Sequence, residues 1–116
     1  MSLELLTDLE RRGLDAYVVL LRERLGDDLL AVRVFGSVAR GEAWWEGMPI
    51  RSDLDLLALV RKQLEPALQQ ELLDATYPLY LESGRQLGPQ FRTPEQHGAS
   101  PSRAAIDADS VELALP

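Results

Sequence analysis

Two neighbouring segments decide the fold of this chain: Phe35-Gly36-Ser37-Val38-Ala39-Arg40-Gly41-Glu42-Ala43 and Ser52-Asp53-Leu54-Asp55-Leu56-Leu57-Ala58-Leu59-Val60. The first places a Gly-Ser turn directly after an apolar run, and the second opens with two carboxylates one residue apart. Alternate residues of a strand point to the same face, so Asp53 and Asp55 are predicted to project together. Glycine lets the backbone approach a ligand closely, and the free N–H groups at a helix start attract anions. The pattern predicts a phosphate site beside a carboxylate pair.

Upstream and downstream of this stretch, apolar periodicity predicts helices and strands in alternation. Leucines at three- and four-residue steps predict a helix over residues 3–25, with a bend or break at Gly13 and an end at Gly26. The apolar run before Gly36 predicts a strand over 29–35, and Ser37 is a suitable cap for a short helix that reaches residue 42. Residues 44–51 are predicted to form a loop that contains both tryptophans, and a second strand covers 53–60.

The second half of the chain has weaker patterns. A helix is predicted over 64–75, with Pro66 in its first turn and Pro78 at its end. Alternating apolar and polar residues predict a third strand over 79–87, which Gly88 and Pro89 terminate. From Thr93 on, composition alone is compatible with disorder, although 102–106 predicts a short helix and 111–115 a terminal strand. His97 is predicted to be exposed and without function.

These elements predict one domain over residues 1–116 of α/β or α+β class, with a small mixed sheet flanked by helices. A chain of 116 residues buries a core of its own but has no room for a second lobe. Its net charge of −7 repels nucleic acid, which disfavours a dedicated DNA or RNA binder. The absence of cysteine, of a basic leader and of a bilayer-length apolar run predicts a cytoplasmic protein without a membrane partner.

The carboxylate pair has two interpretations. Mg²⁺ prefers oxygen ligands and commonly binds through carboxylates together with substrate phosphates, so Asp53 and Asp55 are candidate metal ligands. An Asp-Leu-Asp sequence at a strand start is more often only a polar strand edge, but the preceding Gly36 and Ser37 favour the metal site. Arg40 is either a surface cation or a contact to phosphate, and the sequence leaves both open.

The combined motif of residues 35–43 and 52–57 resembles the DNA polymerase β-like nucleotidyltransferase superfamily, and within it the minimal nucleotidyltransferases. The resemblance implies the polymerase β-like nucleotidyltransferase fold and transfer of a nucleoside monophosphate from ATP or another NTP to a hydroxyl group. In the two-metal arrangement of that family, Asp53 and Asp55 match the Mg²⁺ ligands, while Gly36 and Ser37 match the triphosphate-binding residues. A third carboxylate on the next strand has Glu82 as its best match in this chain.

This chain departs from the family pattern at two places. Fifteen residues separate Ser37 from Asp53, so the loop that carries Trp44 and Trp45 is enlarged. Glu82 lies between Leu81 and Ser83 rather than between two apolar residues, and it also fits the exposed face of an edge strand.

The resemblance further implies a separately encoded, helical HEPN-type partner that receives AMP in a toxin–antitoxin pair. A different class of function is a degenerate module that binds nucleotide or partner without transfer. A third is transfer to a small molecule such as an aminoglycoside, for which a homo-oligomer would have to complete the pocket.

Overall fold

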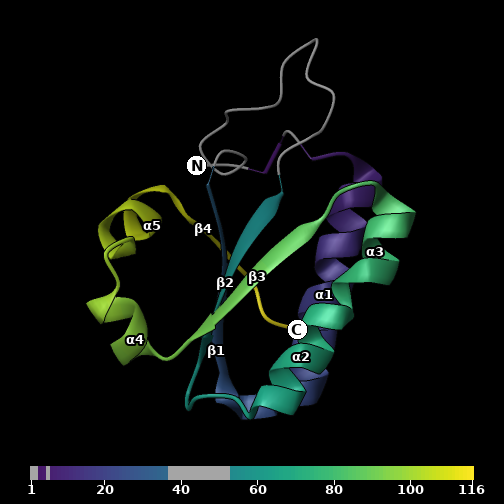
Figure 1. Cartoon of the computed structure of the whole chain (residues 1–116). Helices are drawn as coiled ribbons and strands as arrows, with labels where there is room; N and C mark the ends of the chain where they lie inside the picture. Colours follow the sequence, from purple (N-terminus) through teal and green to yellow (C-terminus); the bar gives the residue numbers. More distant parts are fainter. Residues whose placement is uncertain (1–2, 5, 37–52) are drawn as a thin grey trace.

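The computed structural model describes residues 3–4, 6–36 and 53–116, and within them the chain forms a mixed four-stranded sheet with helices on both faces (Figure 1). The strands are β1 (Leu29–Phe35), β2 (Leu54–Val60), β3 (Leu87–Arg92) and β4 (Val111–Leu113), in the order β3-β2-β1-β4. β1 is antiparallel to β2 and β4, whereas β2 and β3 are parallel. The predicted small mixed sheet is confirmed.

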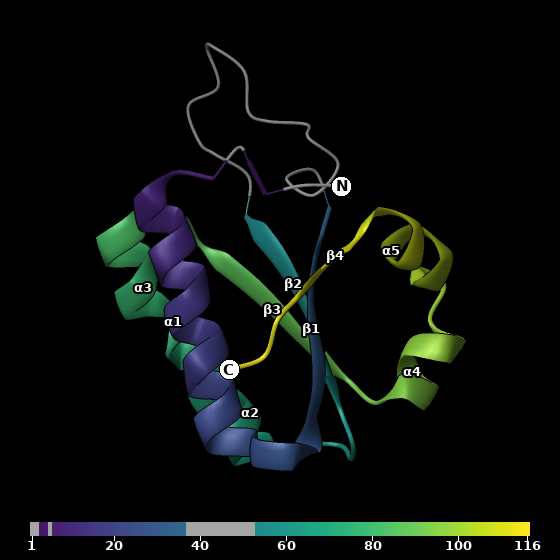
Figure 2. The ribbon, with the colours of Figure 1, turned by 180° about the vertical axis from the view of Figure 1, so that it is seen from behind.

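Three helices lie on one face of the sheet and two on the other, as the two opposite views show (Figures 1 and 2). The first group is α1 (Asp8–Leu25), which a 3-10 turn η1 (Gly26–Asp28) follows, with α2 (Pro66–Asp74) and α3 (Thr76–Ser83). The second group is α4 (Pro94–Ala99) and α5 (Arg103–Asp109). None of the helices in the described ranges is long and apolar enough to cross a membrane.

The first helix begins later than predicted and is not broken at Gly13. Thr7 caps it, because its hydroxyl accepts a hydrogen bond from the Glu10 N–H at 3.1 Å. A Cβ placed on Gly13 would lie 3.6 Å from the Cβ of Ser83, so this glycine is where α3 packs closely on α1. Gly26 ends the helix with a φ of 56°, as the sequence predicts.

The core follows the two-residue period of the strands. On the face toward α1, the even-numbered residues of β1 from Val32 on and those of β2 are buried, among them Val34 and Leu56. On the opposite face, Leu57 and Leu59 pack with Ile106 of α5 in a second, smaller cluster. Asp55 belongs to this second face, so β2 presents a carboxylate on the side that α5 partly covers.

The strand predicted over residues 79–87 is wrong, because residues 76–83 form helix α3. Pro78 lies in the first turn of that helix, where a backbone N–H would have no helical partner, so the proline does not terminate the helix. Gly84 ends α3 in the left-handed conformation, with a φ of 76°, and its N–H donates to the carbonyl of Tyr80 at 2.8 Å.

The third strand comes later and contains the two residues that were expected to stop it. Gly88 and Pro89 both lie within β3, an edge strand that pairs with β2 alone. The Leu54 N–H donates to the carbonyl of Gln86 at 2.9 Å. In a parallel ladder, only every second residue of a strand directs its N–H and carbonyl groups to a given neighbouring strand. The nitrogen of Pro89 therefore faces away from β2, where a missing donor costs no ladder bond.

The segment from Thr93 on forms two helices and a strand. The predicted short helix and terminal strand correspond to α5 and β4, while α4 was not predicted. Its start has a sequence signal nonetheless, since Thr93 and Gln96 form a reciprocal capping box with distances of 3.2 and 2.9 Å.

A buried hydrogen bond between Tyr17 and the carbonyl of Leu72 links α1 to α2 at 2.7 Å, and burial raises the pKa of the Tyr17 hydroxyl. We expect Tyr17→Phe to lower the free energy of unfolding by about 1–3 kcal/mol, because the carbonyl loses its side-chain donor inside the core. Urea unfolding measures the change. Tyr77→Phe is the matched control, since Tyr77 is exposed and should change stability by less than about 0.5 kcal/mol. Equal stabilities of the two variants would contradict the structural role of this bond.

Candidate functional site

The candidate site lies at one end of the sheet, where β1 ends and β2 and β3 begin. The register pairs Asp55 with Phe35 of β1 on one side and with Gly88 of β3 on the other. The Asp55 carboxylate is therefore held over the middle of three adjacent strands rather than at a free edge.

Gly36 follows β1 directly and lies against the Asp55 carboxylate. Its φ is 82°, in the region that residues with a Cβ rarely adopt. A Cβ at this position would lie 2.5 Å from Oδ2 of Asp55. Two independent constraints, backbone conformation and contact with the carboxylate, thus require glycine, and they place the Gly36 backbone beside Asp55.

Gly88 lies near the other oxygen of the same carboxylate. A Cβ on Gly88 would lie 3.6 Å from Oδ1 of Asp55 and 3.9 Å from the Cβ of Asp53. Asp53 precedes β2 and is exposed. Sequence reasoning missed Gly88 because it treated this glycine as the end of a strand; a glycine inside a strand, which often marks a close approach, was the available signal.

Glu82 does not lie on the third strand. It is an exposed residue of α3, six positions before Gly88, the glycine that adjoins Asp53 and Asp55. Across the described residues, no three acidic or histidine side chains come close enough together to hold a metal ion. The structure therefore brings Asp53 and Asp55 to Gly36 and Gly88, but it does not add Glu82 to them, and β3 itself carries no acidic residue.

The remaining predicted site residues, Ser37 and Arg40, lie outside the residues that the structure describes, and so do Trp44, Trp45 and the predicted short helix before them.

A divalent cation is the group that the family pattern implies here, and the donor set of the described residues suits one. The two aspartates offer carboxylate oxygens, the ligands that Mg²⁺ prefers. Gly36 and Gly88 bring backbone close to both oxygens of Asp55 and add no side chain of their own there. The residues present thus fit a cation that is shared with phosphate oxygens.

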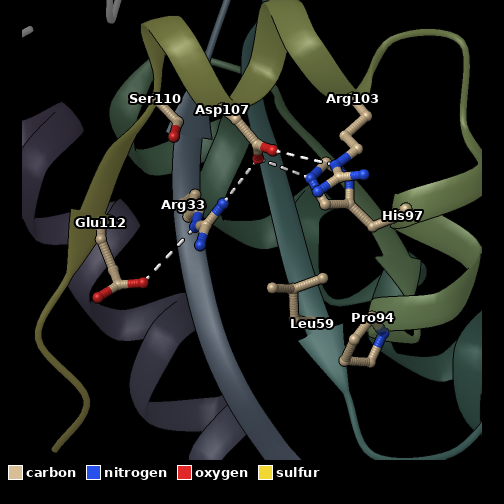
Figure 3. A pocket seen from close by; sticks show the side chains of 9 residues that line it. Arg33, Leu59, Pro94, His97, Arg103, Asp107, Ser110 and Glu112 are labelled. Atoms are coloured by element: carbon tan, nitrogen blue, oxygen red, sulfur yellow. Dashed lines mark hydrogen bonds and ion pairs between the residues drawn. The ribbon is translucent and has the colours of Figure 1, made fainter.

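A second polar cluster occupies the same face of the sheet, beneath α4 and α5. A cavity of about 610 Å³ is lined there by Arg33, His97, Arg103, Asp107 and Glu112, among others (Figure 3). The Asp107 carboxylate is the hub: it lies 2.8 Å from Nε2 of His97, 3.0 Å from Nη1 of Arg33 and 3.5 Å from Nε of Arg103.

The expectation that His97 is exposed is wrong, because only 6% of its surface is accessible. Its hydrogen bond with Asp107 lowers the pKa of that carboxyl, and the charges of His97 and Arg33 lower it further against the opposing effect of burial. Asp107 thereby joins α5 both to α4, through His97, and to the sheet, through Arg33. We interpret the cluster as a clamp that holds the two helices over the second face.

Comparisons with known proteins give matches among solved structures only. No protein-family model matches the chain, and no curated protein does. A candidate minimal nucleotidyltransferase of known structure shares 32% sequence identity at a TM-score of 0.53, over 92% of this chain and 97% of that one.

Two more distant matches are toxin–antitoxin structures. One contains AMP-PNP and has a TM-score of 0.56 at 14% identity, over 88% of this chain and 73% of that chain. The other is a tri-AMPylated HEPN toxin from Shewanella oneidensis in complex with an MNT antitoxin, with a TM-score of 0.54 at 14% identity, over 91% and 72% of the two chains. At this identity the two show a common fold.

The fold and the aspartate pair beside a glycine turn define a nucleotidyltransferase-type domain. With 32% identity to a relative of which it covers nearly the whole length, the chain belongs to the minimal nucleotidyltransferases of the DNA polymerase β-like superfamily.

We expect Gly36→Ala to destabilise the protein by about 1–3 kcal/mol, because the added methyl group meets Asp55 and the positive φ is strained. Gly88→Ala is the matched control: its Cβ reaches Asp55 only at an ordinary contact distance, so stability should change by less than about 1 kcal/mol. Thermal unfolding of both variants measures the difference. A Gly36→Ala protein as stable as Gly88→Ala would contradict the packing of the turn on the carboxylate.

The clamp predicts a pH dependence of stability. The pKa of Asp107 is lower in the folded protein than its ordinary value of 3.8, so its contribution is fully present above that pH and is lost as the pH falls through the lowered value. Asp107→Asn should therefore have a lower free energy of unfolding than wild type at neutral pH. The difference in free energy between the two proteins should become smaller as the pH falls below 3.8. Urea unfolding across this range measures it. Asp109→Asn on the same helix is the control and should follow wild type at every pH.

Proposed function

We propose that this chain is a Mg²⁺-dependent nucleotidyltransferase that transfers AMP from ATP to a hydroxyl group on a partner protein, in the cytoplasm where ATP is abundant. The single observation that supports it most is the Asp55 carboxylate placed between Gly36 and Gly88, with Asp53 beside it. Its relatives point the same way, since one related structure contains AMP-PNP and another contains an AMPylated toxin.

Each residue has a proposed task. Asp53 and Asp55 hold the cation, which when bound offsets negative charge on the triphosphate. The backbone at Gly36, together with Ser37 and Arg40 of the sequence motif, holds the phosphate oxygens. Glu82 is left out of this assignment because it lies on α3.

The transfer itself is a displacement at phosphorus. The hydroxyl oxygen of the acceptor forms a bond to the α-phosphorus, and the bond from that phosphorus to the bridging oxygen breaks. Pyrophosphate leaves with the electron pair of that bond, and the hydroxyl proton passes to water. The work of the protein is to align the two oxygens on opposite sides of the phosphorus.

A protein acceptor suits the charge and size of the chain. With a net charge of −7, the molecule repels the phosphates of a nucleic acid acceptor. The described residues form one sheet with its covering helices and no second lobe that would enclose a small acceptor. We therefore propose a separate helical protein of HEPN type as the acceptor.

A second candidate function is partner binding without transfer. It is favoured by one observation, the position of Glu82 on an exposed helix face instead of the third strand. If a third carboxylate is needed to activate the hydroxyl group, this protein would bind nucleotide and partner but would not transfer AMP.

Incubation with α-labelled ATP, Mg²⁺ and the co-encoded partner protein tests the two functions. We expect label on the partner, and we expect Asp53→Asn with Asp55→Asn to reduce labelling by at least about 100-fold, because the charge that holds the cation is lost. Glu82→Gln is the matched control and, at a saturating concentration of the partner, should label it as wild type does. Calorimetry with and without Mg²⁺ reports whether ATP binding requires the ion.

The outcomes separate the two functions. Stable partner binding with no label from ATP, GTP, CTP or UTP would replace the transferase by the binding module. If Glu82→Gln abolishes transfer but leaves ATP binding normal, Glu82 takes part in catalysis and belongs to the site.

A further inference from the structure

Helix α3 presents an unusual number of large apolar side chains to solvent. The exposed fractions are 60% for Tyr77, 41% for Tyr80 and 65% for Leu81, and the two tyrosine rings lie 6.5 Å apart between centroids. Positions three and four residues apart share one side of a helix, so these residues form a single surface. We name Tyr77, Tyr80 and Leu81 the tyrosine face.

The opposite side of α3 packs against the rest of the protein. Thr76 is buried, Leu79 packs against the main core and Ser83 contacts Gly13 of α1. The helix is thus anchored on one side, and the residues of the tyrosine face are exposed to solvent. Figure 1 shows α3 beside α1 on one flank of the sheet. Contiguous exposed apolar surface of this kind marks interaction sites, and tyrosine is enriched among the residues that carry binding energy.

The charge of the segment that carries α2 and α3 selects the kind of occupant. Residues 63–84 contain four acidic residues and no basic one. The acidic residues are Glu65, Glu71, Asp74 and Glu82, of which Glu71 pairs with Arg24 of α1. A second copy of this chain, related by a two-fold axis, would bring acid against acid, and nucleic acid would be repelled. The complementary surface is one that is apolar at its centre and basic around it.

The helix that carries the tyrosine face is joined to the candidate site by a short connection from its C-terminal end. Five residues lead from Ser83 to Gly88, a path of at most about 18 Å in an extended chain. A buried ion pair of 2.8 Å between Arg85 and Glu10 fixes this connection to α1. A partner domain of about 100 residues has a radius of gyration of about 13 Å, so one docked on α3 extends over the end of the sheet.

We propose that the tyrosine face is the docking surface for the acceptor protein, which binds it through an apolar patch with a basic rim and so brings its hydroxyl group to the Asp53–Asp55 end of the sheet. This inference rests on the proposed function for the identity of the acceptor. The docking itself is independent of nucleotide.

The test is the affinity for the co-encoded partner, measured by calorimetry without nucleotide. Tyr77→Ala with Leu81→Ala should weaken binding at least tenfold, while ATP binding with Mg²⁺ stays as in wild type. Leu30→Ala is the matched control, because Leu30 is also 41% exposed but lies on β1, and it should bind normally. Glu82→Lys should weaken binding severalfold, with a smaller effect at high salt.

Each outcome has a defined meaning. Unchanged affinity of the double variant would overturn the proposal. So would a concentration-dependent dimer of the wild type that the double variant abolishes, because the occupant would then be a second copy. Since binding is measured without ATP, loss of affinity in the double variant supports the docking face even where no NTP labels the partner, and the failure of transfer then counts against the proposed function alone.

Discussion

The structure depends on the packing of one carboxylate between two glycines. Asp55 is paired in register with both neighbouring strands, and Gly36 and Gly88 lie near its two oxygens. A charged group at the start of a central strand is costly to bury, so it needs either polar contacts or access to a ligand. The sheet order, the positive φ after β1 and the glycine in β3 all serve to keep that carboxylate at the end of the sheet, accessible from the face that α5 only partly covers.

A helix, strand or turn could be predicted from the sequence where its pattern depends on residues that are close together in the chain. The first two strands, the helix ending at Gly26 and the glycine turn after the first strand follow from apolar periodicity and glycine placement, which depend on near neighbours. Residues 79–87 were misjudged because Leu79, Tyr80 and Leu81 alternate in hydrophobicity over too few residues to separate a strand from a helix. The packing of Ser83 on Gly13, the first-turn position of Pro78 and the Gly84 cap all belong to the helix that forms instead.

The site was predictable where residues are adjacent in sequence and not where they come from another strand. Asp53, Asp55 and Gly36 lie in one motif, but Gly88 meets them only through the parallel register of β2 and β3. The expected position of Glu82 beside the aspartates depended on a strand over residues 79–87, and these residues form α3 up to Ser83 instead. The Gly- and Pro-containing surroundings of His97 predict exposure, whereas the folded chain buries it and bonds it to Asp107, ten residues away on the next helix.

Pro89 in the edge strand β3 has a consequence for how a peptide meets this protein. Edge strands with free donors recruit extended segments, which add to the sheet as a further strand. With no hydrogen on its outward-facing nitrogen, β3 lacks a donor at the position next to Gly88, so an added strand cannot form a continuous ladder past the aspartates. A polypeptide that delivers a side chain to this end of the sheet must therefore do so from a helix or a turn, and the same interruption protects the molecule from self-association through this edge.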